Sequence, residues 1–209
     1  MSNLDLLKKL IKIESISPND NGCFDVIKQQ FEGLDFSFEE TNYKNISNLV
    51  ITNGNSKNKT FCFLGHTDVV PPGPESEWTV PPFSGDIIDN KIYGRGAADM
   101  KGGVACFVSA LKEFLSKYKD PSFNIMVLLN SNEEGKLENG KVDRVINEMI
   151  DKDKFIDFCL IGEPSSSKKV GDVIRIGRRG SLSGNLKVYG IQGHVAYPKQ
   201  ALNPILGMG

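Results

Sequence analysis

Apolar segments of strand length alternate with amphipathic helical segments along most of this chain, and this alternation constrains the fold more than any other sequence feature. Strands are predicted over short, strongly apolar stretches at residues 48–52, 60–64, 123–130 and 155–161. Helices are predicted where apolar residues recur at helical spacing, at residues 3–13, 24–34, 104–118 and 142–150. Because such alternation favours a sheet covered by helices on both faces, we predict an α/β fold with three layers and a mostly parallel sheet.

Two local signals refine this prediction. Ser2 and Asp5 have the spacing of a capping box at the start of the first helix. The segment DIIDNKIYGRG, residues 86–96, is typical of a hairpin that turns near Asp89 and Asn90. We therefore expect a small hairpin between the strand at 60–64 and the helix at 104–118.

The sequence pattern changes near Gly171. Residues 173–190 alternate apolar and polar side chains, as expected for a half-buried strand in an antiparallel or edge setting. We place a domain boundary so that residues 1–178 form one domain and residues 179–209 begin a second domain of α+β type. About thirty residues are too few to close a core, since stable domains usually exceed ~50 residues. The second domain is therefore expected to be incomplete in this chain.

Composition excludes several classes of protein. The 25 Lys and Arg residues against 26 Asp and Glu give a net charge of −1, which lacks the basic face that nucleic-acid binding needs. No apolar run approaches the roughly 18 residues of a membrane span, and the N-terminus does not resemble a secretory signal. The four cysteines are widely spaced, which argues against a thiolate zinc site. We expect a cytoplasmic protein that binds neither nucleic acid nor membranes.

Acidic residues and a histidine follow the predicted strands and the hairpin. His66 and Asp68 follow FCFLG, Asp99 follows the hairpin, the pair Glu133–Glu134 follows MVLLN, and Glu163 follows FCLIG. In open α/β sheets, ligands bind in the crevice beyond the carboxyl ends of the strands. Several carboxylates gathered there would repel one another without cations. The pattern therefore indicates a metal site.

The spacing of these residues suggests separate roles. His66 and Asp68 are two residues apart, so in an extended backbone their side chains face the same way, and one can orient the other. Glu133 and Glu134 diverge, which suits one carboxylate on a metal and its neighbour moving a proton. Two divalent cations would offset the negative charge of the carboxylates. With a single ion the pocket would keep a net negative charge, which is costly to desolvate.

Simpler explanations exist for each motif taken alone. A lone histidine is more often structural than metal-binding, and Glu133–Glu134 could be a solvated acidic turn before Gly135. The segment GRGAAD has part of a dinucleotide-binding fingerprint, but the third glycine is missing and the segment follows a hairpin. The metal interpretation is favoured because five candidate groups follow neighbouring elements.

The ordered motifs HTDVVPPG, YGRGAADMKGG, NEEG, IGEPS, GRRGSLSG and GIQGHVAYP resemble those of a known family. It is the dinuclear zinc amidohydrolase and peptidase family that includes carboxypeptidase G2 and acetylornithine deacetylase. Within it, the motifs are most similar to the desuccinylase branch. The resemblance covers essentially the whole chain, which corresponds to the N-terminal portion of family members.

This resemblance implies a ligand set for two Zn²⁺ or Co²⁺ ions. His66 and Glu163 would bind one ion, Glu134 the other, and Asp99 would bridge both. Family members supply a further histidine to this site from a later segment. The present chain has only two histidines, the second being His194.

The resemblance also implies roles around the metals. Asp68 would orient His66, and Glu133 would be the general base. His194 would reach the active site of a neighbouring subunit from a lid domain, which requires a homodimer. Substrate carboxylates would be bound by residues near the domain boundary, namely Arg178, Ser181 and Tyr197.

The implied activity is hydrolysis of the amide bond of N-succinyl-LL-2,6-diaminopimelate to succinate and LL-2,6-diaminopimelate, a step of lysine and diaminopimelate biosynthesis. Two alternatives are open: a deacylase for another N-acyl amino acid such as acetylornithine, and a non-catalytic binding or dimerising fragment. Residues 1–178 would be the N-terminal part of the catalytic domain, and residues 179–209 the start of the lid or dimerisation domain. The chain alone is expected to be inactive.

Overall fold

The computed structural model describes residues 1–53, 58–135, 142–152, 154–177, 182 and 184–208. The chain divides into two compact units, Met1–Pro164 and Ser165–Gly209. The domain boundary predicted at residues 178 and 179 stays a prediction, and Arg178 and Arg179 themselves lie outside the described residues. No helix among the residues described here is long and apolar enough to cross a membrane.

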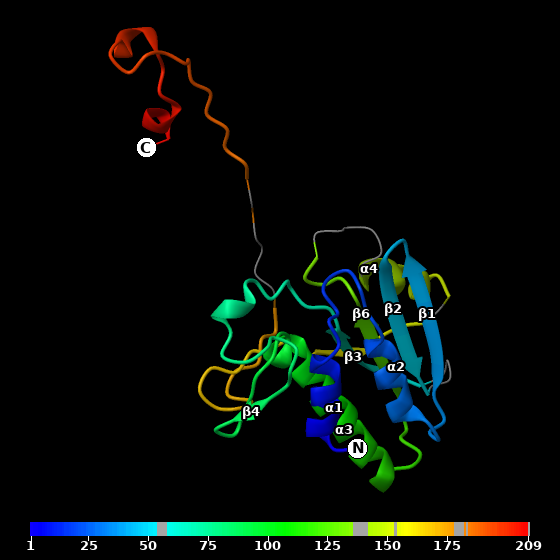
Figure 1. Cartoon of the computed structure of the whole chain (residues 1–209). Coiled ribbons are helices and arrows are strands. Elements are labelled where there is room, and N and C mark those ends of the chain that lie inside the picture. The colour runs from blue at the N-terminus through cyan, green and yellow to red at the C-terminus, as the bar shows by residue number, and fades with distance from the viewer. Residues whose placement is uncertain (54–57, 136–141, 153, 178–181, 183, 209) are drawn as a thin grey trace. The chain divides into compact units, whose positions relative to one another are not determined.

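The first unit contains a five-stranded sheet (Figure 1). In spatial order its strands are β1 (Ser37–Tyr43), β2 (Ile46–Thr52), β6 (Asn124–Asn130), β3 (Thr60–His66) and β7 (Phe158–Ile161). Strand β3 runs parallel to both β6 and β7, whereas β2 is antiparallel to β1 and β6. The α/β class is confirmed, and the sheet is mixed because β1 and β2 form a hairpin at one edge.

Helices cover both faces of this sheet. One face packs against three helices, α1 (Asn3–Ile11), α2 (Cys23–Lys28) and α3 (Gly102–Lys117). The other face packs against α4 (Val142–Ile150). Strand β6 is buried along its whole length, as a central strand must be when both of its faces are covered. The three predicted layers are therefore present in the described part of this unit.

The local signals in the sequence are confirmed. Ser2 caps α1: its hydroxyl accepts a hydrogen bond from the backbone N–H of Asp5 at 3.2 Å, and its own N–H donates to the Asp5 carboxylate. Strands β4 (Ile87–Ile88) and β5 (Lys91–Ile92) form the small hairpin. Its turn uses Asp89 and Asn90 with φ of 48° and 62°, the left-handed conformation that asparagine and aspartate tolerate best after glycine.

The remaining regular elements are short. Single helical turns occur at Gln29–Phe31, Glu75–Glu77, Ala97–Lys101, Pro198–Gln200 and Pro204–Gly207. The turn Ala97–Lys101 leads directly into α3.

The second unit contains little regular structure among its described residues. The strand expected within residues 173–190 is not formed in the described part of that range, where Ile176 and Leu182 are fully exposed. The one backbone bridge among the described residues of this unit joins Ile191 and Leu202. A half-buried strand needs a sheet to pair with and a core to cover, and the described residues of this unit supply neither.

Candidate metal centre

Three parallel strands bring the candidate residues to one edge of the sheet. Strand β3 ends at His66, which is in register with Asn130 at the end of β6. The acidic pair Glu133–Glu134 follows β6, and Glu163 follows β7 after a single glycine. Because parallel strands place their carboxyl ends together, residues separated by about 100 positions of sequence meet here.

Two glycines, Gly103 and Gly162, allow the start of α3 and the end of β7 to approach each other closely. A Cβ atom on Gly162 would lie 2.5 Å from the ring of Phe63. A Cβ atom on Gly103, in the first turn of α3, would lie 2.4 Å from the carbonyl oxygen of Gly162. Larger residues at these positions would separate the start of α3 from the end of β7. The two glycines therefore set the spacing between Asp99, which precedes α3, and Glu163, which follows β7.

The His66 ring is buried and held in a defined orientation. Its Nδ1 atom lies 2.9 Å from the backbone carbonyl oxygen of Asp68. Because a carbonyl oxygen can only accept, Nδ1 carries the hydrogen, and in the neutral ring Nε2 carries the lone pair. That Nε2 atom lies 3.2 Å from Asp99 Oδ1 and 3.4 Å from Glu163 Oε1.

These separations fit the ligand set of a metal ion. A tetrahedral zinc ion with ligand bonds of about 2.0–2.2 Å separates its ligand atoms by about 3.3–3.6 Å. The distances from His66 Nε2 to the Asp99 and Glu163 oxygens are close to that range. A second group, His66 with Glu133 and Glu134, also offers ligand atoms that lie within 4.8 Å of one another. The donor set of one imidazole and several carboxylates suits zinc or a similar divalent ion.

The charges in this cluster favour a bound cation. Burial alone would lower the pKa of His66, but its hydrogen bond to Glu163 and the charges of Asp68 and Glu163 raise that pKa to about 9. Partial burial and the neighbouring Glu163 carboxylate raise the pKa of Asp99. Burial and the charge of Asp99 raise the pKa of Glu134. The ionised forms of Asp99 and Glu134 are therefore destabilised, and a divalent cation beside these carboxylates would relieve that repulsion.

Asp68 connects the end of β3 to the acidic turn that follows β6. Its side chain is fully buried, with Oδ1 3.5 Å from His66 Nδ1. Oδ1 also accepts a hydrogen bond from the backbone N–H of Glu133 at 3.0 Å, and Oδ2 accepts one from Glu134 at 3.2 Å. The hydroxyl of Ser17 donates to Oδ2 as well. Asp68 thus fixes the backbone of both glutamates in addition to the role near His66 that its spacing predicts.

Two charged side chains that pack near this edge of the sheet, Lys101 and Asp20, were not predicted from the sequence. Lys101 is buried, and its Nζ donates hydrogen bonds of 2.8 Å to the carbonyl oxygens of Leu10 and Ile13 at the end of α1. Asp20 accepts a hydrogen bond from the Thr67 hydroxyl at 3.0 Å, one residue after His66. Burial raises the pKa of Asp20 and lowers the pKa of Lys101. Nothing in the local sequence distinguishes these two side chains from surface charges.

The other predicted site residues are not part of this cluster. His194 and Tyr197 belong to the second unit, where their rings lie 5.7 Å apart and His194 Nδ1 accepts a hydrogen bond from the backbone N–H of Ala196. Arg178 and Ser181 lie outside the described residues. The roles given to these four residues stay predictions.

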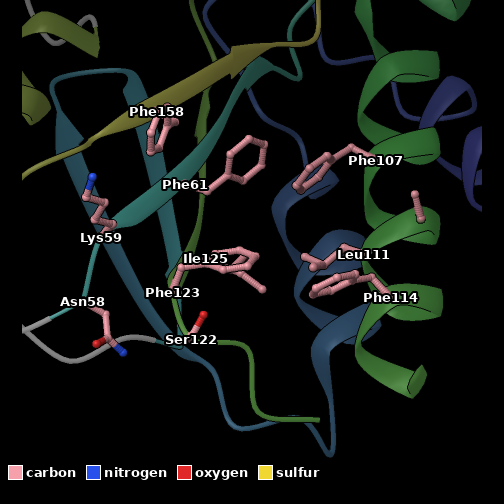
Figure 2. Close-up of a pocket in the computed structure, with 11 residues that line it drawn as sticks. Asn58, Lys59, Phe61, Phe107, Leu111, Phe114, Ser122, Phe123, Ile125 and Phe158 are labelled. Carbon is pink, nitrogen blue, oxygen red and sulfur yellow. The ribbon is translucent and has the colours of Figure 1, made fainter. Parts of the chain in front are cut away.

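The candidate metal centre is distinct from an apolar pocket of about 680 Å³ between α3 and the sheet (Figure 2). This pocket is lined by residues near the amino ends of the parallel strands, among them Phe61, Ile125 and Phe158. None of the candidate ligands lines it. The candidate ligands therefore lie at the carboxyl ends of the parallel strands, and the apolar pocket lies near their amino ends.

Comparison with known proteins identifies similar chains. The sequence model of the peptidase family M20/M25/M40 matches residues 62–203. The chain is 48% identical over 202 residues to succinyl-diaminopimelate desuccinylase of Psychromonas ingrahamii and 47% identical to that of Methylococcus capsulatus. Each alignment covers 97% of this chain and 53% of the relative. The chain thus spans about half the length of these curated relatives.

Solved structures share the fold. The M20 family metallo-carboxypeptidase Sso-CP2 from Sulfolobus solfataricus is 26% identical, with a TM-score of 0.63 over 78% of this chain and 37% of that one. Human carnosine dipeptidase 1 is 23% identical, with a TM-score of 0.64 over 76% of this chain and 37% of that one.

Proposed function

Because this chain belongs to the peptidase family M20/M25/M40, we propose that its residues form part of the active site of a metal-dependent amidohydrolase. The reaction is hydrolysis of N-succinyl-LL-2,6-diaminopimelate to succinate and LL-2,6-diaminopimelate. The observation that carries the proposal is the convergence of His66 Nε2 with the carboxylates of Asp99 and Glu163. The 47–48% identity to the two desuccinylases across 97% of this chain supports this choice of substrate.

The geometry and the resemblance together support the following ligand roles. His66 and Glu163 would hold one Zn²⁺ or Co²⁺ ion, Glu134 would hold a second, and Asp99 would lie between them. Such ions, when bound, supply polarisation of the amide carbonyl and a lowered pKa for water. Asp68 maintains the His66 tautomer that leaves Nε2 free to bind, because its carbonyl oxygen accepts the Nδ1 hydrogen.

Glu133 is the residue to which we assign proton transfer in this reaction. Its side chain is exposed at the mouth of the site, and its backbone N–H is fixed by Asp68. We assign it the role of general base: its carboxylate takes a proton from the attacking water and then gives it to the nitrogen of the leaving amine. Glu133 and Glu134 both offer a carboxylate close to His66. We assign metal binding to Glu134 and proton transfer to Glu133.

The resemblance supports further assignments for a protein of the relatives' full length. Two subunits would pair so that His194 of each stabilises the oxyanion in the other's site. The substrate carboxylates would be bound by side chains of the second unit and its boundary, namely Arg178, Ser181 and Tyr197. The 209-residue chain alone, with its two histidines, would be inactive.

A comparison of two substrates tests the proposal. We expect the full-length protein to show kcat/KM at least about 10²-fold higher for N-succinyl-LL-2,6-diaminopimelate than for N-acetylornithine, because a site built to pair with the succinyl carboxylate discriminates strongly against a ligand that lacks it. A preference for the acetyl compound would assign the chain to another deacylase of the same family. Absence of hydrolysis of either compound by the metal-loaded full-length protein would favour a binding function.

A further inference from the structure

Two cysteines face each other across the parallel strands β3 and β7. Cys62 and Cys159 are paired in register, four residues before His66 and Glu163 respectively. Neighbouring strands lie about 4.7–4.9 Å apart, and a disulfide requires a Cα separation of about 4.4–6.8 Å. Both thiols are free. The in-register pairing therefore brings the two Cα atoms into the range of separation that a disulfide requires.

The two thiols differ in access. Cys62 is completely buried. It belongs to the apolar cluster between the sheet and α4, with Leu128 of β6 and Val145 of α4. Cys159 is exposed. In the 209-residue chain an oxidant can therefore reach Cys159 directly, whereas Cys62 is protected from solvent. The other two cysteines, Cys23 and Cys106, lie in helices α2 and α3, away from this strand pair.

The two thiols also differ in pKa. The hydrogen bond from Cys62 lowers the pKa of Cys159, whereas that same bond and burial raise the pKa of Cys62. Cys159 is thus the better nucleophile toward an oxidant, since the thiolate is the reactive form. Burial raises the pKa of Cys23 to about 11, which makes that thiol inert by comparison.

We propose that Cys62 and Cys159 are a modification site: a thiol pair that hydrogen peroxide converts to an intramolecular disulfide. The Cys159 thiolate attacks one peroxide oxygen, which breaks the O–O bond and yields a sulfenic acid and hydroxide. The Cys62 sulfur then attacks the sulfenic sulfur, the S–S bond forms, and the hydroxyl leaves as water with the Cys62 proton. In sum, two thiols are oxidised by two electrons, and one peroxide is reduced to two waters.

The test uses the 209-residue protein treated with hydrogen peroxide under native conditions, followed by alkylation of the remaining thiols and mass spectrometry. We expect an unalkylated pair with a mass loss of about 2 Da, a non-reduced peptide that joins β3 to β7, and full reversal by dithiothreitol. The readout is independent of hydrolytic activity, so it can fail or succeed whether or not the proposed function holds.

Matched variants identify the pair. Cys159→Ser and Cys62→Ala should each abolish the linked peptide, and Cys106→Ser should leave its yield unchanged, because Cys106 is exposed on α3 and is not in register with another cysteine. If Cys62→Ala does not fold because its position is buried, Cys159→Ser at an exposed position still tests the proposal. Oxidation of Cys159 to sulfinic acid without a link to Cys62, or a link between two chains, would overturn the proposal.

Discussion

Replacing Glu133 with glutamine in the full-length protein should lower kcat at least about 10²-fold and leave the metal content unchanged. Glutamine keeps the size of the side chain but cannot accept the proton of the attacking water. The backbone of Glu133 is fixed through its N–H by Asp68, so the substitution should not move the turn. The measurement is kcat with N-succinyl-LL-2,6-diaminopimelate alongside metal content by plasma emission spectrometry.

Glu134→Gln provides the matched control, because the two glutamates are adjacent and Asp68 accepts a hydrogen bond from the backbone of each. We expect Glu134→Gln to lose bound metal, since its carboxylate is the proposed ligand. If Glu133→Gln loses the metal and Glu134→Gln retains it, the two roles are reversed.

The second large effect is expected on stability. Asp68→Ala should lower the free energy of unfolding of the first unit by about 3–5 kcal/mol, because a buried carboxylate that accepts hydrogen bonds from two backbone N–H groups and the Ser17 hydroxyl is removed. Each donor left without its acceptor costs about 1–3 kcal/mol. Urea denaturation followed by fluorescence reports this unit, since Trp78 is the single tryptophan of the chain.

Asp5→Ala is the control for that measurement, because Asp5 lies in the same unit as Asp68 and Trp78. The Asp5 carboxylate also accepts hydrogen bonds, from the backbone N–H and the hydroxyl of Ser2, but it is exposed. Water can replace an exposed acceptor, so we expect a loss of only about 1 kcal/mol or less. Equal effects of the two substitutions would show that Asp68 does not stabilise the site through its buried hydrogen bonds.

Elements with strong local signals were predictable from the sequence. The capping box at Ser2 and the hairpin turn at Asp89–Asn90 depend on contacts between near neighbours, and both are present. Strand β1 (Ser37–Tyr43) was missed because its sequence, SFEETNY, is polar and mostly exposed. Its structure depends on pairing with β2, and such a partner cannot be read from the strand itself.

The same limit explains the strand that was predicted and is not formed. In residues 173–190 apolar and polar side chains alternate, which gives the segment one apolar face that could be buried. The exposed Ile176 and Leu182 show that no such burial occurs within the described residues. Alternation alone does not create a strand when no core is available to cover it.

The convergence of the candidate ligands was predictable in outline because most of them follow strands of the sheet whose carboxyl ends must meet. The sequence could not reveal that Asp68 would bind the backbone of residues near position 133, or that Lys101 would be buried against the end of α1. Both facts depend on contacts between segments more than 60 residues apart. Residue type and spacing locate a candidate site. The hydrogen bonds that hold its backbone in place depend on long-range packing, which the sequence does not reveal.

Zinc binding by the 209-residue chain tests the central claim most directly. Calorimetric titration of the metal-free chain with Zn²⁺ should show at least one binding site. His66→Ala should lower the zinc affinity of that site more than about 100-fold, because loss of a residue that only hydrogen-bonds to a ligand already lowers metal affinity about 10–100-fold. His194→Ala, which removes the other histidine of the chain, should leave that site unchanged. Equal zinc affinity with and without the His66 imidazole would contradict the account.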